Sequence, residues 1–69
     1  MQRTPVSSSN VASVGYDPES STLEIEFNNG AIYQYFDVNE NIFNELLGAS
    51  SVGGYLASSI KGKYRFSRV

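Results

Sequence analysis

The chain has 69 residues, a formal net charge of −2, and neither Cys nor His. Its length allows one domain, which we expect over residues 1–69, and the two missing residue types exclude disulfides, the usual zinc sites and catalysis by His or Cys. Five Tyr and four Phe within an apolar share of 41% are enough for one small core. Because the composition excludes a membrane span and the start is not typical of a signal peptide, we expect a complete small cytoplasmic protein without cofactor or metal.

Charge is distributed unevenly along the chain. Residues 1–59 hold one base against seven acids, whereas residues 60–69 hold four bases and no acid. A basic end on an acidic body predicts a polarised surface. Since the whole chain is not basic, we favour the interpretation that the basic end serves solubility and lies against the acidic body.

The first part of the chain predicts a lead-in followed by a strand. Residues 1–9 contain a proline and three consecutive serines, so we expect a loose segment that could still add a short edge strand. Residues 10–16 alternate in polarity and predict a strand, with Val11 on the face opposite to Ala12, Val14 and Tyr16. A proline at position 18 among small polar residues predicts the turn that ends it.

A hairpin is the clearest prediction. Residues 23–27 alternate apolar and acidic residues and predict a strand whose inward side chains are Leu23, Ile25 and Phe27. Asn28–Gly30 then predicts a tight turn, because Asn and Gly tolerate positive φ, and residues 31–36 predict the return strand.

Two registers compete for this hairpin. A two-residue turn would place Gln34 on the apolar face. A three-residue turn with Gly30 as a bulge instead pairs Ile25 with Tyr33 and gives an unbroken apolar face that includes Tyr35. We favour the bulge because it buries no amide side chain. Two apolar residues then remain on the opposite face, Ile32 and Phe36.

Two amphipathic helices are predicted next. The first begins at Asp37, an N-cap with Glu40 in capping-box spacing, and ends at Gly48. Its apolar stripe consists of Val38, Ile42, Phe43, Leu46 and Leu47.

The second helix is capped by Ser50 or Ser51 and ended by Gly62 in a left-handed conformation. Gly53 and Gly54 weaken its helix propensity, so we expect them to allow the close approach of another backbone. Residues 63–69 predict a last strand, which carries Tyr64 and Phe66 on one face.

The order strand, strand, strand, helix, helix, strand predicts an α+β fold. We expect an antiparallel β-meander of three strands, a two-helix segment packed on one face, and a final C-terminal strand that returns to the sheet. The expected core lies between sheet and helices and consists of Leu23, Ile25, Phe27, Phe43, Leu46, Leu47, Leu56 and Ile60.

The C-terminal segment interleaves cations with aromatic residues, which weakly resembles the strands of RNA-recognition domains. As a nucleic-acid site it would use Lys61, Lys63, Arg65 and Arg68 for phosphates and Tyr64 for stacking. We favour the alternative in which Tyr64 and Phe66 belong to the core. Tyr33 and Tyr35 present the same choice between an aromatic contact surface and the core, and there too we favour the core.

Two patterns typical of enzymes are attributed to chance. Glu24 and Glu26 lie ~7 Å apart on one strand face, like paired glycosidase carboxylates, but so small a sheet predicts no cleft. Ser58 and Lys61 match the S-x-x-K pattern without its companion motifs. No acidic residues have the spacing of a metal site. We therefore expect a protein that is not an enzyme.

The segments above resemble a known family over about sixty residues. They are Ser8–Val11, Val14–Asp17, Leu23–Phe27, Asn29 and Gly30 with Tyr33 and Tyr35, Asp37 and Val38, Ala49–Gly53, Ile60 and Tyr64. In this order they resemble the KTSC domain, a small bacterial module named after its occurrence at the C-terminus of some lysyl-tRNA synthetases. The chain departs from the family at Asn39, where Pro is frequent, and at Ala57, where Asn is frequent. The resemblance implies RNA binding by association with the synthetases.

Two hypotheses for function follow. The first is a small non-catalytic binding domain with weak affinity for RNA through the basic C-terminal strand. The alternative is a protein–protein interaction module, including a homodimer, that uses Ile32, Phe36 or a sheet edge. Convergence of the four C-terminal cations on one face would favour RNA, and their dispersal would favour a protein partner.

Overall fold

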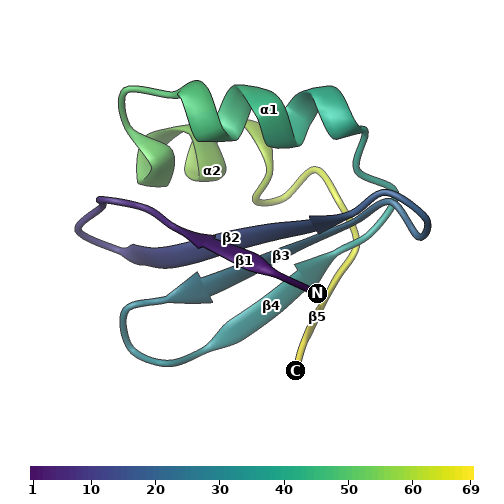
Figure 1. The fold of residues 1–69 in the computed structure, drawn as a ribbon, viewed down its shortest axis with the longest axis horizontal. Helices are drawn as coiled ribbons and strands as arrows, with labels where there is room; N and C mark the ends of the chain where they lie inside the picture. The colour runs from purple at the N-terminus through teal and green to yellow at the C-terminus, as the bar shows by residue number, and fades with distance from the viewer.

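The computed structural model describes residues 1–69, which form five strands and two helices. The elements are β1 (Arg3–Pro5), β2 (Val11–Asp17), β3 (Thr22–Phe27), β4 (Ile32–Tyr35), α1 (Glu40–Gly48), α2 (Val52–Ser59) and β5 (Phe66–Arg68). The strands form one antiparallel sheet in chain order, and both helices lie over the same face of it (Figure 1). The α+β class and the returning last strand are confirmed. Neither helix is long and apolar enough to cross a membrane.

The predicted meander was one strand short, because the lead-in contributes β1. Four strands therefore precede the helices. β1 pairs with β2, with Arg3 opposite Gly15. A Cβ at Gly15 would lie 2.6 Å from the carbonyl oxygen of Gln2, so the close approach of this strand requires a glycine. Arg3 also forms an ion pair with Glu24 at 3.2 Å.

A bulge changes the faces predicted for β2. The register shifts between Val11 and Ser13, so Val11 and Val14 are both fully buried. The prediction that Val11 lies on the opposite face was wrong, because strict alternation does not hold across a bulged residue.

The hairpin register is confirmed. Ile25 pairs with Tyr33, and the backbone N–H of Phe27 donates to the carbonyl of Ala31 at 2.9 Å. Gly30 adopts the positive φ of 91° that the turn requires. Gln34 lies on the opposite face, where its amide donates to Glu24.

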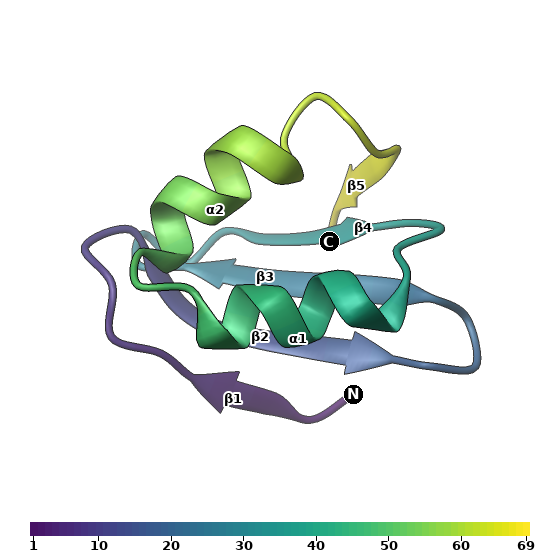
Figure 2. The same cartoon turned by 90° about the horizontal axis from the view of Figure 1, so that it is seen from above.

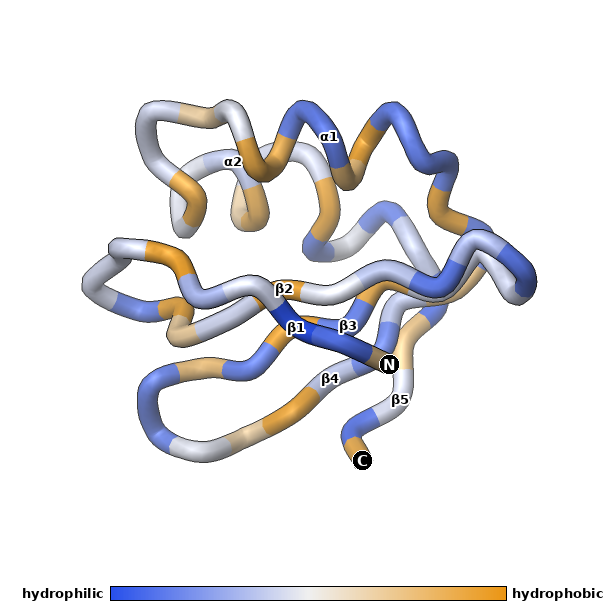
Figure 3. Tube along the Cα trace, viewed as in Figure 1, coloured by the Kyte–Doolittle hydropathy of each residue, from blue (hydrophilic) through white to orange (hydrophobic).

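The core lies between the sheet and the helices, whose apolar residues gather mainly on the side towards the sheet (Figure 3). Five of the eight predicted core residues are fully buried: Leu23, Ile25, Leu46, Leu56 and Ile60. Phe27 and Phe43 are half-buried and pack against that core. Leu47 is 40% exposed, so the prediction that it belongs to the core was wrong. It follows Leu46 by about 100° around the helix, which carries it away from the sheet.

α1 begins later than predicted. Its N-cap is Asn39, whose side chain accepts from the N–H of Asn41, and not Asp37. Asp37 instead has φ of 59°, in the left-handed region, so it belongs to the turn that leads into the helix. This turn buries Val38 completely, and the carbonyl of Val38 accepts a hydrogen bond from the Tyr16 hydroxyl.

The second helix begins as predicted but ends earlier, and the glycine interpretation was wrong. Ser51 caps α2 by accepting from the N–H of Gly54, whereas the helix ends at Ser59 with Ile60 as its C-cap. Gly62 has the expected left-handed φ of 79°, but it lies in the turn after the helix. A Cβ at Gly53 would meet only the side chains of Ser8 and Asn10, at ordinary contact distances, and no other backbone.

The last strand is shorter than predicted. Only residues 66–68 pair with β4, and residues 60–63 form turns. Phe66 is 58% exposed, so its assignment to the core was wrong. β5 lies at the sheet edge, where the helices do not cover the Phe66 ring.

Candidate functional site

A groove lies beside α1, where β4 and β5 meet the turn that follows α2. Figure 2 shows α1 over β2 and β3, with α2, β4 and β5 to one side of it. The groove has a volume of about 470 Å³. Four aromatic residues and two cations line it: Phe27, Tyr33, Tyr35, Phe66, Lys61 and Arg68. The groove therefore combines an aromatic surface with positive charge.

The aromatic rings form a connected set. Phe27 meets Tyr33 edge to face, with centroids 5.6 Å apart. Phe66 lies 5.8 Å from both Tyr33 and Tyr35, and thus leans on the two tyrosines from the sheet edge. Tyr35 is buried, and this burial raises the pKa of its hydroxyl above the ordinary 10.0. The exposed Phe66 ring and the half-buried Tyr33 ring remain available to a planar ligand.

The two cations of the groove have no carboxylate partner. The ion pairs of the chain join Arg3 to Glu24 and Arg65 to Asp37, and neither pair lies in the groove. Lys61 holds its ammonium 5.2 Å from the centroid of the Phe27 ring. No acidic residue lines the groove, so its positive charge is not neutralised locally.

A second hollow of about 390 Å³ adjoins the first. The two share Phe27, Asn29 and Lys61, and the second adds Ser9, Asn10 and Asn28. We call them the aromatic hollow and the amide hollow. Lys61 lies where they meet.

The predicted nucleic-acid residues are only partly brought together. Lys61 and Arg68 line the aromatic hollow. Arg65 pairs with Phe36 and therefore lies on the opposite sheet face, where its guanidinium contacts Asp37 and lies 5.8 Å from the Phe36 ring. Lys63 is exposed in the turn before β5, and Tyr64 is half-buried against the core. The basic segment is thus split between two faces, and by the criterion set above this dispersal favours a protein partner over RNA binding by the whole segment. A nucleic-acid site must therefore rest on the two cations of the groove, Lys61 and Arg68.

Tyr33 and Tyr35 were assigned to the core, and they line the aromatic hollow as well. Phe27 and Phe66 were not predicted as site residues, because an apolar residue that alternates with polar residues along a strand usually belongs to the core. The asparagines of the amide hollow were not predicted either, because Asn28 and Asn29 were interpreted only as turn residues.

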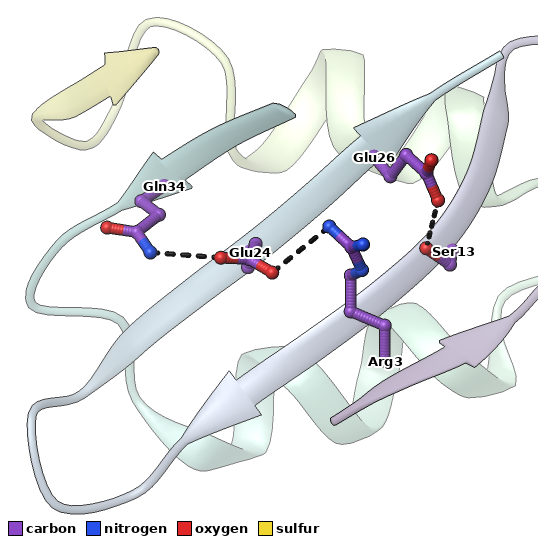
Figure 4. Close-up of polar contacts among 5 residues, drawn as sticks. All are labelled: Arg3, Ser13, Glu24, Glu26 and Gln34. Carbon is purple, nitrogen blue, oxygen red and sulfur yellow. Dashed lines mark hydrogen bonds and ion pairs between the residues drawn. The ribbon is translucent and has the colours of Figure 1, made fainter. Parts of the chain in front are cut away.

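The opposite sheet face carries a polar network, shown in Figure 4. Glu24 accepts hydrogen bonds from Arg3 and Gln34, and Glu26 accepts one from Ser13 at 2.8 Å. These carboxylates therefore join strands of the sheet by hydrogen bonds. No three His, Cys, Asp or Glu side chains gather in the chain as a metal-binding group.

The S-x-x-K pattern brings no Ser–Lys pair together. Ser58 donates to the carbonyl of Tyr55, whereas Lys61 turns to the Phe27 ring.

A sequence model of the KTSC domain matches residues 7–64, which is most of the chain. The chain belongs to the KTSC domain family. A crystal structure of a KTSC domain protein from Yersinia pestis superposes with a TM-score of 0.94 at 42% identity, covering 99% of this chain and 96% of that one. This structural similarity therefore extends over β1 and β5, both of which lie outside the residues that the family model matches.

Two kinds of relatives carry similar sequences. An uncharacterized protein of Stutzerimonas stutzeri is 40% identical over 70 residues, covering 100% of this chain and 99% of the relative. A lysine–tRNA ligase of Nostoc sp. is 39% identical over 54 residues, which is 78% of this chain but 10% of the ligase. The KTSC domain thus occurs as nearly the whole of one relative and as a small part of the other. None of these matches indicates a catalytic family.

Proposed function

We propose that this KTSC domain is a non-catalytic binding domain that takes a short single-stranded segment of RNA in its groove. The observation that carries the proposal is the aromatic hollow, which joins the exposed Phe66 ring and the half-buried Tyr33 ring to two unpaired cations. Proteins that bind single strands combine these two features, since bases stack on aromatic rings while cations follow the phosphates.

Charge supports a polyanion as the ligand. Lys61 and Arg68 lie in a groove without acids, whereas the carboxylates of Glu24 and Glu26 lie on the opposite face of the sheet. A phosphate backbone would meet cations without acids in the groove, whereas on the opposite face Arg3 and Arg65 are each paired with a carboxylate, so the groove is the favoured face. The similarity to part of a lysine–tRNA ligase is consistent with a role near RNA.

The affinity should be weak, because only two of the four C-terminal cations lie in the groove and the whole chain has a net charge of −2. The contacts of the proposed site are Lys61 and Arg68 to phosphates and Tyr33 and Phe66 to bases. Lys63, Arg65 and Tyr64 are no longer part of it.

The test is a fluorescence-anisotropy titration of a labelled single-stranded RNA at low salt. Phe66→Ala should weaken binding about tenfold, because it removes one stacking ring. It should leave folding intact, since Phe66 is 58% exposed. Lys61→Gln should weaken binding too, and Lys63→Gln is the matched control, with the same change of charge outside the groove.

Equal effects of Lys61→Gln and Lys63→Gln would contradict the proposal, as would the absence of binding at high micromolar protein. If an acidic peptide bound in the groove and RNA did not, the site would be assigned to a protein partner, which is the alternative function.

A further inference from the structure

The position of Lys61 divides the groove into two parts of different chemistry. Phe27, Asn29 and Lys61 line both hollows, and the ammonium of Lys61 lies above the Phe27 ring. A single cation thus stands between a surface of aromatic rings and a surface of amides. This matches one step of a nucleic-acid strand, where a phosphate links two riboses that each carry a base.

The aromatic hollow can stack a base without selecting which base it is. Tyr33 and Phe66 present ring faces and edges, and every base has a π-face that stacks on such rings. We therefore expect this hollow to accept any base.

The amide hollow offers hydrogen bonds that the fold does not use. Asn28 donates its side-chain amide to the carbonyls of Ser8 and Ser9, at 3.3 and 2.9 Å, which leaves its side-chain oxygen as an acceptor. Asn29 accepts from the N–H of Ala31 at 3.0 Å, which leaves its side-chain NH₂ as a donor. The exposed side-chain amide of Asn10 has both functions free, because only its backbone is bonded within the chain.

We propose that the groove binds a dinucleotide step of single-stranded RNA, with the phosphate at Lys61, one base stacked in the aromatic hollow and the next base read by hydrogen bonds in the amide hollow. This inference rests on the proposed function and adds to it a position at which sequence is selected. An adjacent donor and acceptor fit the edge of a base, which also carries donors and acceptors side by side. Phosphate contacts alone carry no such information.

The experiment is a titration of the whole chain with RNA dinucleotides of every sequence, with mononucleotides as the reference. The chemical shifts of the backbone amides report the binding. Dinucleotides should bind at least about tenfold more tightly than either mononucleotide, since two hollows are filled. Affinity should depend on the base at one of the two positions and be nearly the same for every base at the other.

Two variants separate the hollows. Asn10→Ala should reduce the ratio of affinities between the best and the worst dinucleotide towards one, while Phe66→Ala should weaken all dinucleotides alike. Asn44→Ala is the matched control, because Asn44 is an exposed amide on α1 outside both hollows. The backbone carbonyl of Asn10, which accepts from Asn28, is kept in its variant.

Mononucleotides that bind as tightly as dinucleotides would overturn the dinucleotide site, as would equal sequence preference in the Asn10→Ala and Asn44→Ala chains. The proposed function would stand in both cases if a longer RNA still bound in a manner that depends on Lys61 and not on Lys63. If no RNA bound at all, the proposed function itself would be wrong.

Discussion

At the scale of single residues, Gly15 decides whether β1 can join the sheet. The carbonyl oxygen of Gln2 approaches it so closely that a Cβ would lie 2.6 Å away, and the Cγ of Arg3 would lie 3.0 Å away. The backbone of Gln2 cannot move aside as easily as the end of a flexible side chain can. Any residue larger than glycine at position 15 must therefore displace β1.

We predict that Gly15→Ala lowers the free energy of unfolding by about 1–3 kcal/mol, as other overpacked sites do. Urea denaturation would measure this, and the backbone amides of Thr4 and Val6 should lose protection in hydrogen exchange. Gly48→Ala is the control, because a Cβ there meets nothing within 4 Å. It should be neutral or stabilising by up to about 1 kcal/mol. Equal effects of the two substitutions would show that β1 is not held in this way.

At the scale of elements, α1 docks through a narrow stripe. Leu46 is fully buried, whereas its neighbour Leu47 is 40% exposed. The two leucines have the same size and the same backbone, and only their positions around the helix differ.

We predict that Leu46→Ala costs about 3–5 kcal/mol, because a large buried side chain is lost and a cavity remains. Since a domain of this size has a margin of about 3–5 kcal/mol, much of the variant should be unfolded at room temperature. Leu47→Ala should cost less than about 1 kcal/mol. Thermal and urea melts followed by circular dichroism would compare them, and similar losses at both positions would contradict the observed docking of α1.

Elements defined by local chemistry could be predicted from the sequence. The hairpin register followed from Gly30 and from the cost of burying Gln34, and Ser51 begins α2 as expected. Three features could not be predicted from the sequence, because they depend on distant parts of the chain. β1 pairs only because Gly15 admits it, Val11 reaches the core only through a bulge, and Phe66 is exposed because the helices end before β5.

The candidate site was predictable to a similar degree. Lys61, Arg68, Tyr33 and Tyr35 were named from their chemistry, and the structure brings them together. The separation of Arg65 from Phe66 followed from the alternation predicted for residues 63–69. Which face would meet the groove was not predictable, because it depends on the pairing of β5 with β4.

At the scale of the whole molecule, charge is divided between the two faces of the sheet. The groove holds Lys61 and Arg68 without acids, and the opposite face holds Glu24 and Glu26 within a polar network. Binding of a polyanion should therefore release few counterions.

We predict that log K for single-stranded RNA falls against log salt with a slope of about −1.4, from two phosphate contacts at ~0.7 each. Four contacts by the whole C-terminal segment would give a slope of about −3. Anisotropy titrations over a series of salt concentrations measure the slope. Arg68→Gln should reduce it by about half, and Arg65→Gln should leave it unchanged because Arg65 lies on the other face. A slope near −3 would mean that Lys63 and Arg65 also reach the ligand.

The strand order of the sheet also bears on how the molecule comes apart. β1 to β4 each pair with the strand next to them in the chain, but β5 joins β4 only after the chain has passed through both helices. With three residues at an uncovered edge, β5 is the element that local unfolding would release first. Such a fluctuation removes Phe66 and Arg68 from the aromatic hollow while Leu23, Ile25 and Leu46 stay packed. The groove would then be lost under milder conditions than the fold itself, so a spectrum that reports a native core does not guarantee a competent site.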